Sequence, residues 1–216
     1  MPAAAFAAGV DELLAASVDA TPRELAAALR SAAAVHASGR DRTVEVVWTG
    51  PPTPRLPVRL TAQALKQLIE GAHDRLIVAS FAVYDIEDVA LALYNAADRG
   101  VQVELILESV TGSGGKMTFE GATQLGRQTL ERCQLFTWPL SRRPTVHGSA
   151  ASLHAKFAVA DRTCLLTTSA NLTGHALGLN MELGVLITGG EAPREVVRLV
   201  DDLIAQGDLV GYTPVA

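Results

Sequence analysis

The sequence predicts an α/β fold built on a largely parallel sheet, preceded by a helical segment. From Thr61 onward, stretches with helical spacing of apolar residues alternate with short apolar strands. A proline-rich stretch at 51–60 separates this region from Ala-rich helices at the N-terminus. Alternating strands and helices are typical of βαβ units with parallel neighbours. We therefore expect a helical appendage over residues 1–39 and an α/β domain over residues 40–216.

The appendage is predicted from a helix start signal in "TPRELAAALRSAAAVHA", residues 21–37. Thr21 and Glu24 have capping-box spacing, in which each side chain satisfies a backbone N–H of the other residue. Pro22 suits the first helical position, where its missing N–H does no harm. Apolar residues follow at helical spacing, so we expect a helix here.

The remaining elements are predicted from apolar periodicity and from turn residues between them. Helices are expected where apolar residues recur every third or fourth position, and strands where short apolar runs lie between turns. The expected elements, in chain order, are a strand at 43–50, a helix at 61–73, a strand at 75–84, a helix at 86–100, a strand at 101–108, a helix at 120–131, a strand at 133–139, a hairpin beginning at 152, a strand at 182–188 and a helix at 193–206.

The composition is that of an ordinary globular protein, with 49% hydrophobic and 19% charged residues among 216. Its formal net charge of −5 argues against a protein that coats nucleic acid or an anionic membrane through bulk charge. Residues 101–175 nevertheless hold seven Lys or Arg against five Asp or Glu, which makes them the one positive stretch of the sequence.

The sequence also bears on location. The Ala-rich N-terminus lacks the basic region of a signal peptide, and no segment is long and apolar enough to span a bilayer. Cys133 and Cys164 lack CxxC spacing, and we expect them to be unpaired thiols in a reducing compartment. These features predict a cytoplasmic protein with no membrane partner.

Two common kinds of site are not supported by the spacing of their residues. The glycine-rich loop "TGSGGKMT" (111–118) has Val110 where a phosphate-binding loop needs its first glycine, and Met117 where it needs Ser or Thr. We expect a flexible surface loop instead. The histidines and acidic residues between 154 and 175 lack tight metal-ligand spacing, so we expect no metal and no other cofactor. Metal catalysis is kept as an alternative that chelators would reveal.

The segment "SLHAKFAVADRTCLLTTSANLTGHALGLNMELGVLI", residues 152–187, carries the most specific chemistry. Its apolar residues alternate as in half-buried strands, yet His154 and Lys156 would project together from one face of the first strand. Histidine serves as nucleophile or general acid, lysine and asparagine donate to phosphoryl oxygens, and a carboxylate fixes the tautomer of a histidine. The candidate site residues, which suit phosphoryl chemistry without a metal, are His154, Lys156, Ser169, Asn171 and Glu182.

The spacing of these residues resembles the signature of the phospholipase D superfamily, H-x-K-x4-D-x6-G-S-x-N followed by a downstream acidic residue. The matching residues are His154, Lys156, Asp161, Ser169 and Asn171. Glu182 is the downstream acid, and Thr168 stands where the superfamily usually has glycine, which adds a side chain beside the site. Asp161 falls near the predicted hairpin turn, on the opposite strand parity from the histidine, so we interpret it as structural.

The resemblance implies an αβα sandwich with a mixed sheet and a metal-independent phosphodiesterase. In the superfamily two motifs form one active site, and this sequence holds one, so the resemblance implies a homodimer with a shared site. It implies that His154 is the nucleophile and, from the partner, the general acid. It also implies that Lys156 and Asn171 stabilise the phosphoryl oxygens with Ser169 in support, and that Glu182 orients the histidine.

A wider pattern, which includes "VVWTGPPTPRL" and "LNMELGVLI", is similar to the phospholipase D-like component of the DISARM anti-phage defence system over residues 44–210. This similarity implies a nuclease with nucleic acid, above all DNA, and other DISARM components as partners. The loop 140–152 leads into the candidate site, and we expect an exposed, mobile arm there. Its Arg142, Arg143 and His147 would bind phosphate, although a solvated loop that only aids solubility is the alternative.

Two alternatives to a nuclease stay open. Thr168 and the modest positive charge fit a subunit with little or no catalytic activity that binds nucleic acid or assembles a defence complex. A phospholipid hydrolase would need an exposed apolar entrance or an amphipathic membrane-binding helix. In the sequence, the Ala-rich N-terminal helices are the only candidates for such a helix.

Overall fold

The computed structural model describes residues 12, 15, 20–40, 42–52, 57–110 and 121–213. The chain divides into two compact units, Met1–Asp41 and Arg42–Ala216. In the first unit, helix α2 (Pro22–Arg40) begins directly after Thr21. The predicted capping box is confirmed, because Thr21 N donates to Glu24 Oε2 at 2.8 Å and Glu24 N donates to Thr21 Oγ1 at 3.3 Å.

The second unit contains the sheet and the helices that cover it. Its helices are α3 (Thr61–Glu70), α4 (Glu87–Asp98), α5 (Arg127–Leu130), α6 (Gly174–Gly178) and α7 (Ala192–Ala205), with 3-10 turns η1 (Gly121–Leu125) and η2 (Leu140–Arg142). Its strands are β1 (Thr43–Thr49), β2 (Arg59–Leu60), β3 (Arg75–Ser80), β4 (Val83–Tyr84), β5 (Gln102–Leu107), β6 (Gln134–Thr137), β7 (Thr145–Val146), β8 (Ser149–Ala150), β9 (Phe157–Ala160), β10 (Cys164–Thr168), β11 (Leu172–Thr173), β12 (Glu182–Thr188) and β13 (Val210–Gly211).

Nine strands form one sheet in the order β13-β6-β5-β3-β9-β10-β12-β1-β2. The predicted α/β fold with a mixed sheet is confirmed, but the expected predominance of parallel pairs is wrong. Among the described strands of this sheet, β3·β5, β5·β6 and β1·β2 are parallel and the other five neighbouring pairs are antiparallel. One cause is the short turn 161–163 between β9 and β10, because a short turn reverses the chain whereas a parallel pair needs a long crossover.

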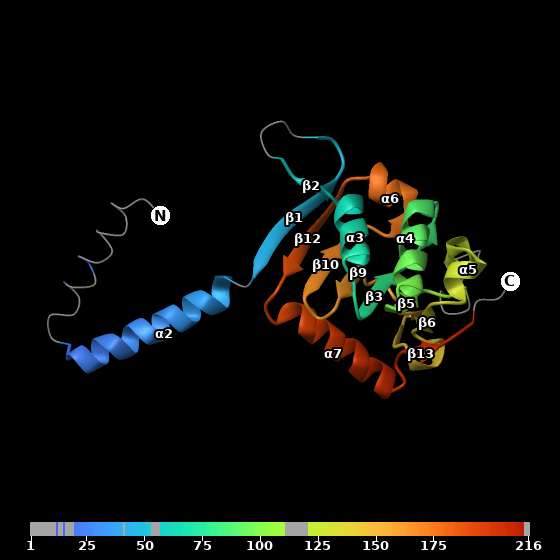
Figure 1. The fold of residues 1–216 in the computed structure, drawn as a ribbon. Helices are drawn as coiled ribbons and strands as arrows, with labels where there is room; N and C mark the ends of the chain where they lie inside the picture. Colours follow the sequence, from blue (N-terminus) through green and yellow to red (C-terminus); the bar gives the residue numbers. More distant parts are fainter. Residues whose placement is uncertain are drawn as a thin grey trace. The chain divides into compact units, whose positions relative to one another are not determined.

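Helices cover both faces of the sheet, which gives the αβα layers implied by the resemblance (Figure 1). Alternate residues of each central strand therefore enter different cores. In β9, Ala158 packs into the core beneath α3 and α4, and Val159 packs into the core beneath α7. In β10, Leu166 and Leu165 divide in the same way.

Two predicted elements are shorter or more broken than expected. The expected helix 120–131 is a 3-10 turn followed by the four-residue α5, because Gly126 between them has φ of 77° and interrupts the helix. The expected strand 75–84 is divided into β3 and β4. The side chain of Ser80 marks this break, since its Oγ donates to Ala82 O at 2.7 Å and accepts from Leu172 N at 3.0 Å.

The placement of His154 and Lys156 on a strand is also wrong. Strand β9 begins at Phe157, and residues 151–156 before it belong to no strand. The last pairs on either side of β9 are formed by Phe157 with Ala79 and with Thr167. Because β3 ends at Ser80, the segment before Phe157 has no regular partner on that side.

Several smaller expectations can be compared with the described residues. Cys133 and Cys164 are both free thiols, as expected. None of the described helices combines the length and the apolarity needed to cross a membrane. The glycine-rich loop 111–118 and most of the predicted helical stretch before Thr21 lie outside the described residues.

Asp161 lies in the turn between β9 and β10 with φ of 50°, and its carboxylate ties this turn to the start of β3. Oδ2 accepts from His73 N at 2.8 Å, and Oδ1 accepts from Asp74 N at 2.8 Å and Arg75 N at 3.0 Å. Partial burial acts to raise the pKa of Asp161, but these backbone donors outweigh it, so the pKa lies below its usual value.

Asp161→Asn is therefore expected to lower the free energy of unfolding at neutral pH by about 1–2 kcal/mol, because charge-assisted bonds in a partly exposed turn are weakened by solvent. A carboxylate with a lowered pKa stabilises the fold above its usual value of 3.8 and loses this effect as pH falls through the folded-state pKa. The free energies of unfolding measured in urea should differ between variant and wild type at pH 7, and this difference should disappear in acid. Asp74→Asn, at a neighbouring exposed aspartate, is the control, and a difference independent of pH would contradict the assignment.

Candidate active site

The candidate site is centred on His154, which is exposed at the end of the sheet just before β9. Its Nδ1 lies 3.1 Å from Nζ of Lys156, and the same Nζ donates to the backbone oxygen of His154 at 2.8 Å. The Phe81 ring packs against the imidazole, with centroids 5.4 Å apart and planes tilted by 51°. His154 and Lys156 are thus side by side, as expected, although they belong to no strand.

The surroundings of Lys156 change its own pKa, and its contact with His154 bears on the tautomer of that ring. Partial burial lowers the pKa of the Lys156 ammonium, and the negative charge of Glu182 offsets part of this effect. When the ammonium donates to Nδ1 of a neutral His154, the ring proton is on Nε2. In this tautomer Nε2 has no free lone pair for attack on phosphorus. Nucleophilic attack by Nε2 requires the proton to be on Nδ1, and a histidine that acts as general acid must be a doubly protonated imidazolium.

Ser169 and Glu182 meet across β10 and β12. Ser169 Oγ donates to Glu182 Oε2 at 2.5 Å and accepts from Leu183 N at 3.2 Å, while Asn180 Nδ2 donates to Glu182 Oε1 at 3.4 Å. Among the described residues, the hydrogen bonds of the Glu182 side chain therefore go to Ser169 and Asn180 and none goes to His154. The orienting role expected for Glu182 remains a prediction, and in the free chain Glu182 interacts electrostatically with Lys156.

Asn171 follows Ser169 by two residues and has a buried amide oxygen. Within the described part of the chain this Oδ1 has no hydrogen-bond partner. A buried polar atom without a partner is unfavourable, and a group that reaches this amide would supply the missing hydrogen bond. Since the oxygen and nitrogen of an amide can exchange places by rotation, Asn171 can present either a donor or an acceptor to a ligand.

Thr168, which replaces the glycine of the superfamily signature, is accommodated by a glycine on the neighbouring strand. The strand register places Thr168 opposite Gly184. A Cβ on Gly184 would lie 2.6 Å from Thr167 O and 2.8 Å from Thr168 Cβ. The space needed by the threonine is thus supplied by β12, and Thr168 Oγ1 accepts from Ala170 N at 3.1 Å.

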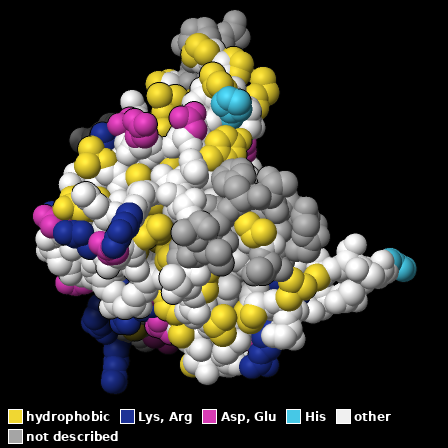
Figure 2. All heavy atoms as spheres, turned by 90° about the vertical axis from the view of Figure 1, so that its right-hand side faces the viewer, with side chains coloured by type: hydrophobic (Ala, Val, Ile, Leu, Met, Phe, Trp, Pro, Cys, Tyr) yellow, Lys and Arg dark blue, Asp and Glu magenta, His cyan; other side chains and the backbone are white. Residues whose placement is uncertain are grey.

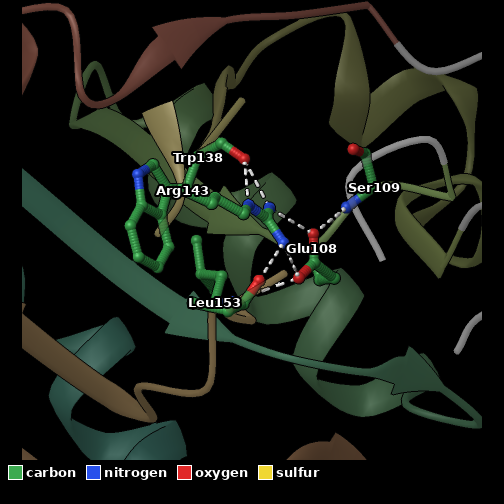
Figure 3. Close-up of polar contacts among 6 residues, drawn as sticks. Glu108, Ser109, Trp138, Arg143 and Leu153 are labelled. Atoms are coloured by element: carbon green, nitrogen blue, oxygen red, sulfur yellow. Dashed lines mark hydrogen bonds and ion pairs between the residues drawn. The ribbon is translucent and has the colours of Figure 1, made fainter. Parts of the chain in front are cut away.

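The expectation that Arg143 binds phosphate from an exposed arm is wrong. Its side chain is 0% exposed and forms an ion pair with the equally buried Glu108, with Arg143 Nη2 2.7 Å from Glu108 Oε1 (Figure 3). The guanidinium also lies 5.3 Å from the centre of the Trp138 ring. Arg143 is buried because the carboxylate of Glu108, directly after β5, is buried and requires a counter-charge.

The rest of the predicted arm is divided between a surface turn and a hairpin. Arg142 is exposed, but its Nη2 donates to Gln206 O at 2.7 Å and its Nε lies 4.0 Å from Asp208 Oδ1. His147 is exposed in the turn of the β7–β8 hairpin, with φ of 50°. On the face drawn in Figure 2, Lys and Arg side chains are mixed with Asp and Glu rather than gathered into a continuous basic surface.

An apolar pocket of about 670 Å³ opens beside His154, between α7 and the sheet. Leu153, Phe157 and Leu203 are among its lining residues, and Arg142 and Asp208 are the charged residues that line it. Such a pocket can bind an apolar group next to the reacting atoms.

Sequence reasoning missed Glu108, Phe81 and the apolar pocket. A signal for Glu108 was present, because this carboxylate ends an apolar strand, where a buried acid needs a cationic partner. The contact between Phe81 and His154 joins residues far apart in the sequence, and no local pattern indicates it. The pocket depends on the docking of α7, which periodicity alone does not place.

The close fit between β10 and β12 makes Gly184 sensitive to substitution. Gly184→Ala should lower the free energy of unfolding by about 1–3 kcal/mol, because the added carbon would overlap the Thr167 carbonyl and neither strand can shift without its partner. Gly178→Ala is the control, since a Cβ there meets nothing within 4 Å. Thermal and urea unfolding of both variants test this, and equal stability of the two would contradict the proposed fit.

Comparison with known proteins places the chain in a family. The family model described as "Cardiolipin synthase, PLD-like domain" matches residues 65–204. The chain is 26% identical over 173 residues to DISARM protein DrmC of Bacillus paralicheniformis, covering 75% of this chain and 63% of that protein. It is 25% identical over 169 residues to cardiolipin synthase A of Yersinia pseudotuberculosis, covering 78% of this chain and 32% of that protein.

The chain thus spans less than two thirds of the length of these relatives. Among solved structures, Nuc from Salmonella typhimurium, described as a phospholipase D family member, superposes with a TM-score of 0.56 at 18% identity, over 79% of this chain and 98% of that one. The resemblance to the phospholipase D superfamily and to the DISARM protein is therefore confirmed. Because the family model matches more than half of the chain, the protein belongs to the phospholipase D-like domain family.

Proposed function

We propose that the protein is a metal-independent phosphodiesterase that cleaves nucleic acid in anti-phage defence, through a phosphohistidine formed on His154 in a homodimer. The observation that carries this proposal is the exposed His154, with Nδ1 3.1 Å from Lys156 Nζ. The similarity to DrmC supports a role in defence, with nucleic acid and other DISARM components as partners. Such an enzyme would act in the cytoplasm, where invading nucleic acid is found.

The proposed reaction has two displacements on phosphorus. The lone pair of His154 Nε2 attacks phosphorus, the bond from phosphorus to the leaving oxygen breaks, and the imidazolium of His154 of the partner subunit gives its Nε2 proton to that oxygen and becomes neutral. Water then attacks the phosphohistidine, its proton goes to the partner's His154, and the phosphorus–nitrogen bond breaks. Lys156 and Asn171 donate to the phosphoryl oxygens as charge gathers there, with Ser169 in support.

The tautomer of His154 must change before attack, because Lys156 occupies the Nδ1 side in the free protein. A bound phosphodiester attracts the Lys156 ammonium and thereby releases Nδ1. Glu182, which acts on Lys156 electrostatically, is then the carboxylate that accepts Nδ1–H and leaves the Nε2 lone pair free. In this proposal the orienting role of Glu182 begins only when substrate binds.

A homodimer is proposed because the sequence holds one His-x-Lys motif and the reaction uses two histidines. A two-fold interface brings the same residue of each subunit close to the axis. Exposed apolar residues next to the site support an interface there: Leu179, Met181 and Leu183 are 73%, 69% and 58% exposed and alternate with Asn180 and Glu182. Apolar side chains gathered at such exposure favour contact with a partner.

A second candidate function, hydrolysis of a phospholipid, is favoured by the apolar pocket beside His154. An acyl chain bound there would place the adjoining phosphodiester near the histidine. The third possibility, a subunit with little catalytic activity, is based on Thr168 and on the modest positive charge. The fit of Thr168 opposite Gly184 removes the steric argument for it, though activity itself is what decides.

The function is tested with single-stranded DNA, duplex DNA, RNA and a fluorescent phosphatidylcholine analogue as substrates. We expect cleavage of nucleic acid, its loss by at least about 1000-fold in His154→Ala because the nucleophile is absent, and full activity in EDTA. Acid-labile phosphate on His154 should be trapped after rapid quenching.

The other outcomes separate the alternatives. Cleavage of the lipid alone, reduced by Leu203→Glu in the pocket, would establish the second function. Binding without turnover would establish the assembly subunit, and loss of activity in EDTA would contradict the metal-independent mechanism.

The dimer is tested by placing a charge among the exposed apolar residues. Leu183→Glu should convert a dimer into a monomer and remove activity, because a buried carboxylate at the interface has no counter-charge. Leu91→Glu on α4 is a matched control, since Leu91 and Leu183 are both 58% exposed. Native mass spectrometry and light scattering at micromolar concentration report the mass, and a fully active monomeric wild type would rule out the shared site.

A further inference from the structure

We infer that Glu108 and Arg143 form a positioning pair for His154, which fixes the backbone of the residue immediately before it. The inference deepens the proposed function and rests on it for the catalytic consequence. Neither residue touches the candidate site with its own side chain. Their effect passes through the Leu153 amide.

The pair is fully buried and has a rigid geometry. Both side chains are 0% exposed. Arg143 Nη2 donates to Glu108 Oε1 at 2.7 Å, and Arg143 Nη1 donates to Glu108 Oε2 at 2.8 Å. Two parallel bonds between planar groups fix orientation as well as distance. Figure 3 shows the guanidinium of Arg143 lying between the Glu108 carboxylate and the Trp138 carbonyl.

The remaining bonds of the pair join three separate segments. Glu108 follows β5, and its Oε1 also accepts from Ser109 N at 3.1 Å. Arg143 Nε donates to Trp138 O at 2.8 Å, and Nη1 donates to Ala151 O at 3.1 Å. The end of β5 is thus connected, through Arg143, to both ends of the segment 138–151 that leads into the site.

The contact that matters for the site is made by Glu108 Oε2, which accepts from Leu153 N at 3.1 Å. Residues 151–156 belong to no strand, and the bond that continues the sheet pairing, from Thr168 N to Lys156 O at 3.2 Å, lies two residues after His154. The bond to Leu153 N lies one residue before His154. A carboxylate that is itself held by two bonds from Arg143 therefore anchors this segment on the N-terminal side of His154.

Stability alone does not account for two buried charges at this place. Replacing a buried ion pair with apolar residues of similar volume is often neutral or stabilising, whereas removing one partner is strongly destabilising. An apolar pair could fill the same volume but could not accept the Leu153 N–H. The acceptor function distinguishes a positioning pair from a structural one, and it permits a matched experiment.

The experiment compares two double variants that both lack the ion pair. Glu108→Leu with Arg143→Met removes the acceptor, and Glu108→Gln with Arg143→Met keeps an amide oxygen that can accept the Leu153 N–H. We measure kcat and KM on bis(p-nitrophenyl) phosphate, melting temperature, and amide exchange of residues 151–156. The first variant should lose about 10- to 100-fold in kcat at unchanged KM, with faster exchange in this segment, because a misplaced reacting group slows the chemical step.

The second variant should recover most of the kcat and most of the exchange protection. Equal kcat and equal exchange in the two variants would overturn the inference. If neither variant folds, the wild type still decides, because its Leu153 amide should exchange at least about 10-fold more slowly than that of Ala155, and equal rates would contradict the anchor. A wild type without phosphodiesterase activity would refute the proposed function, while the exchange comparison would still test the pair.

Discussion

The candidate site depends on how the β9–β10 hairpin is held in the middle of the sheet. This hairpin lies between β3 and β12, and pairing on both sides fixes its register. The segment with His154 enters at one end of the hairpin, and Ser169 leaves at the same end because the two strands are antiparallel. At the opposite end, Asp161 bonds to three backbone N–H groups at the start of β3. The turn anchors the hairpin, and the open end carries the candidate catalytic residues.

Strand β5 shows how one strand supports both ends of this arrangement. Glu104, Ile106 and Glu108 follow one another at alternate positions, so they face the α7 side together. At one end of β5, Glu104 accepts from Arg75. The same arginine also pairs with Asp201 on α7. Ile106 lines the apolar pocket, and Glu108 anchors the segment before the histidine at the other end. A single face of one strand therefore connects the covering helix, the pocket and the site.

The sequence predicted the family of the protein better than the backbone of the candidate site. The fixed spacing from His154 to Asn171 identified the family because local spacing determines which residues can meet in a hairpin. The strand expected at His154 failed because strand pairing depends on where the neighbour β3 ends, which is a tertiary property. The prediction for Arg143 failed for a related reason. A charged residue between a turn and a proline has the local pattern of a surface residue. Its burial depends on the carboxylate of Glu108, which is distant in the sequence.

The same burial changes how a phosphodiester would be attracted to the site. Arg143 is buried in its ion pair with Glu108, and the exposed Arg142 contacts Gln206 and Asp208. The loop expected to bind phosphate therefore offers little positive charge to a phosphodiester. The net charge of −5 gives no general attraction for a polyanion either.

In one subunit, Lys156 is the cation in direct contact with His154. A two-fold dimer would bring two Lys156 ammonium groups and two histidines to one phosphorus. Association would then supply both the second proton-transfer group and the local charge that a single chain lacks.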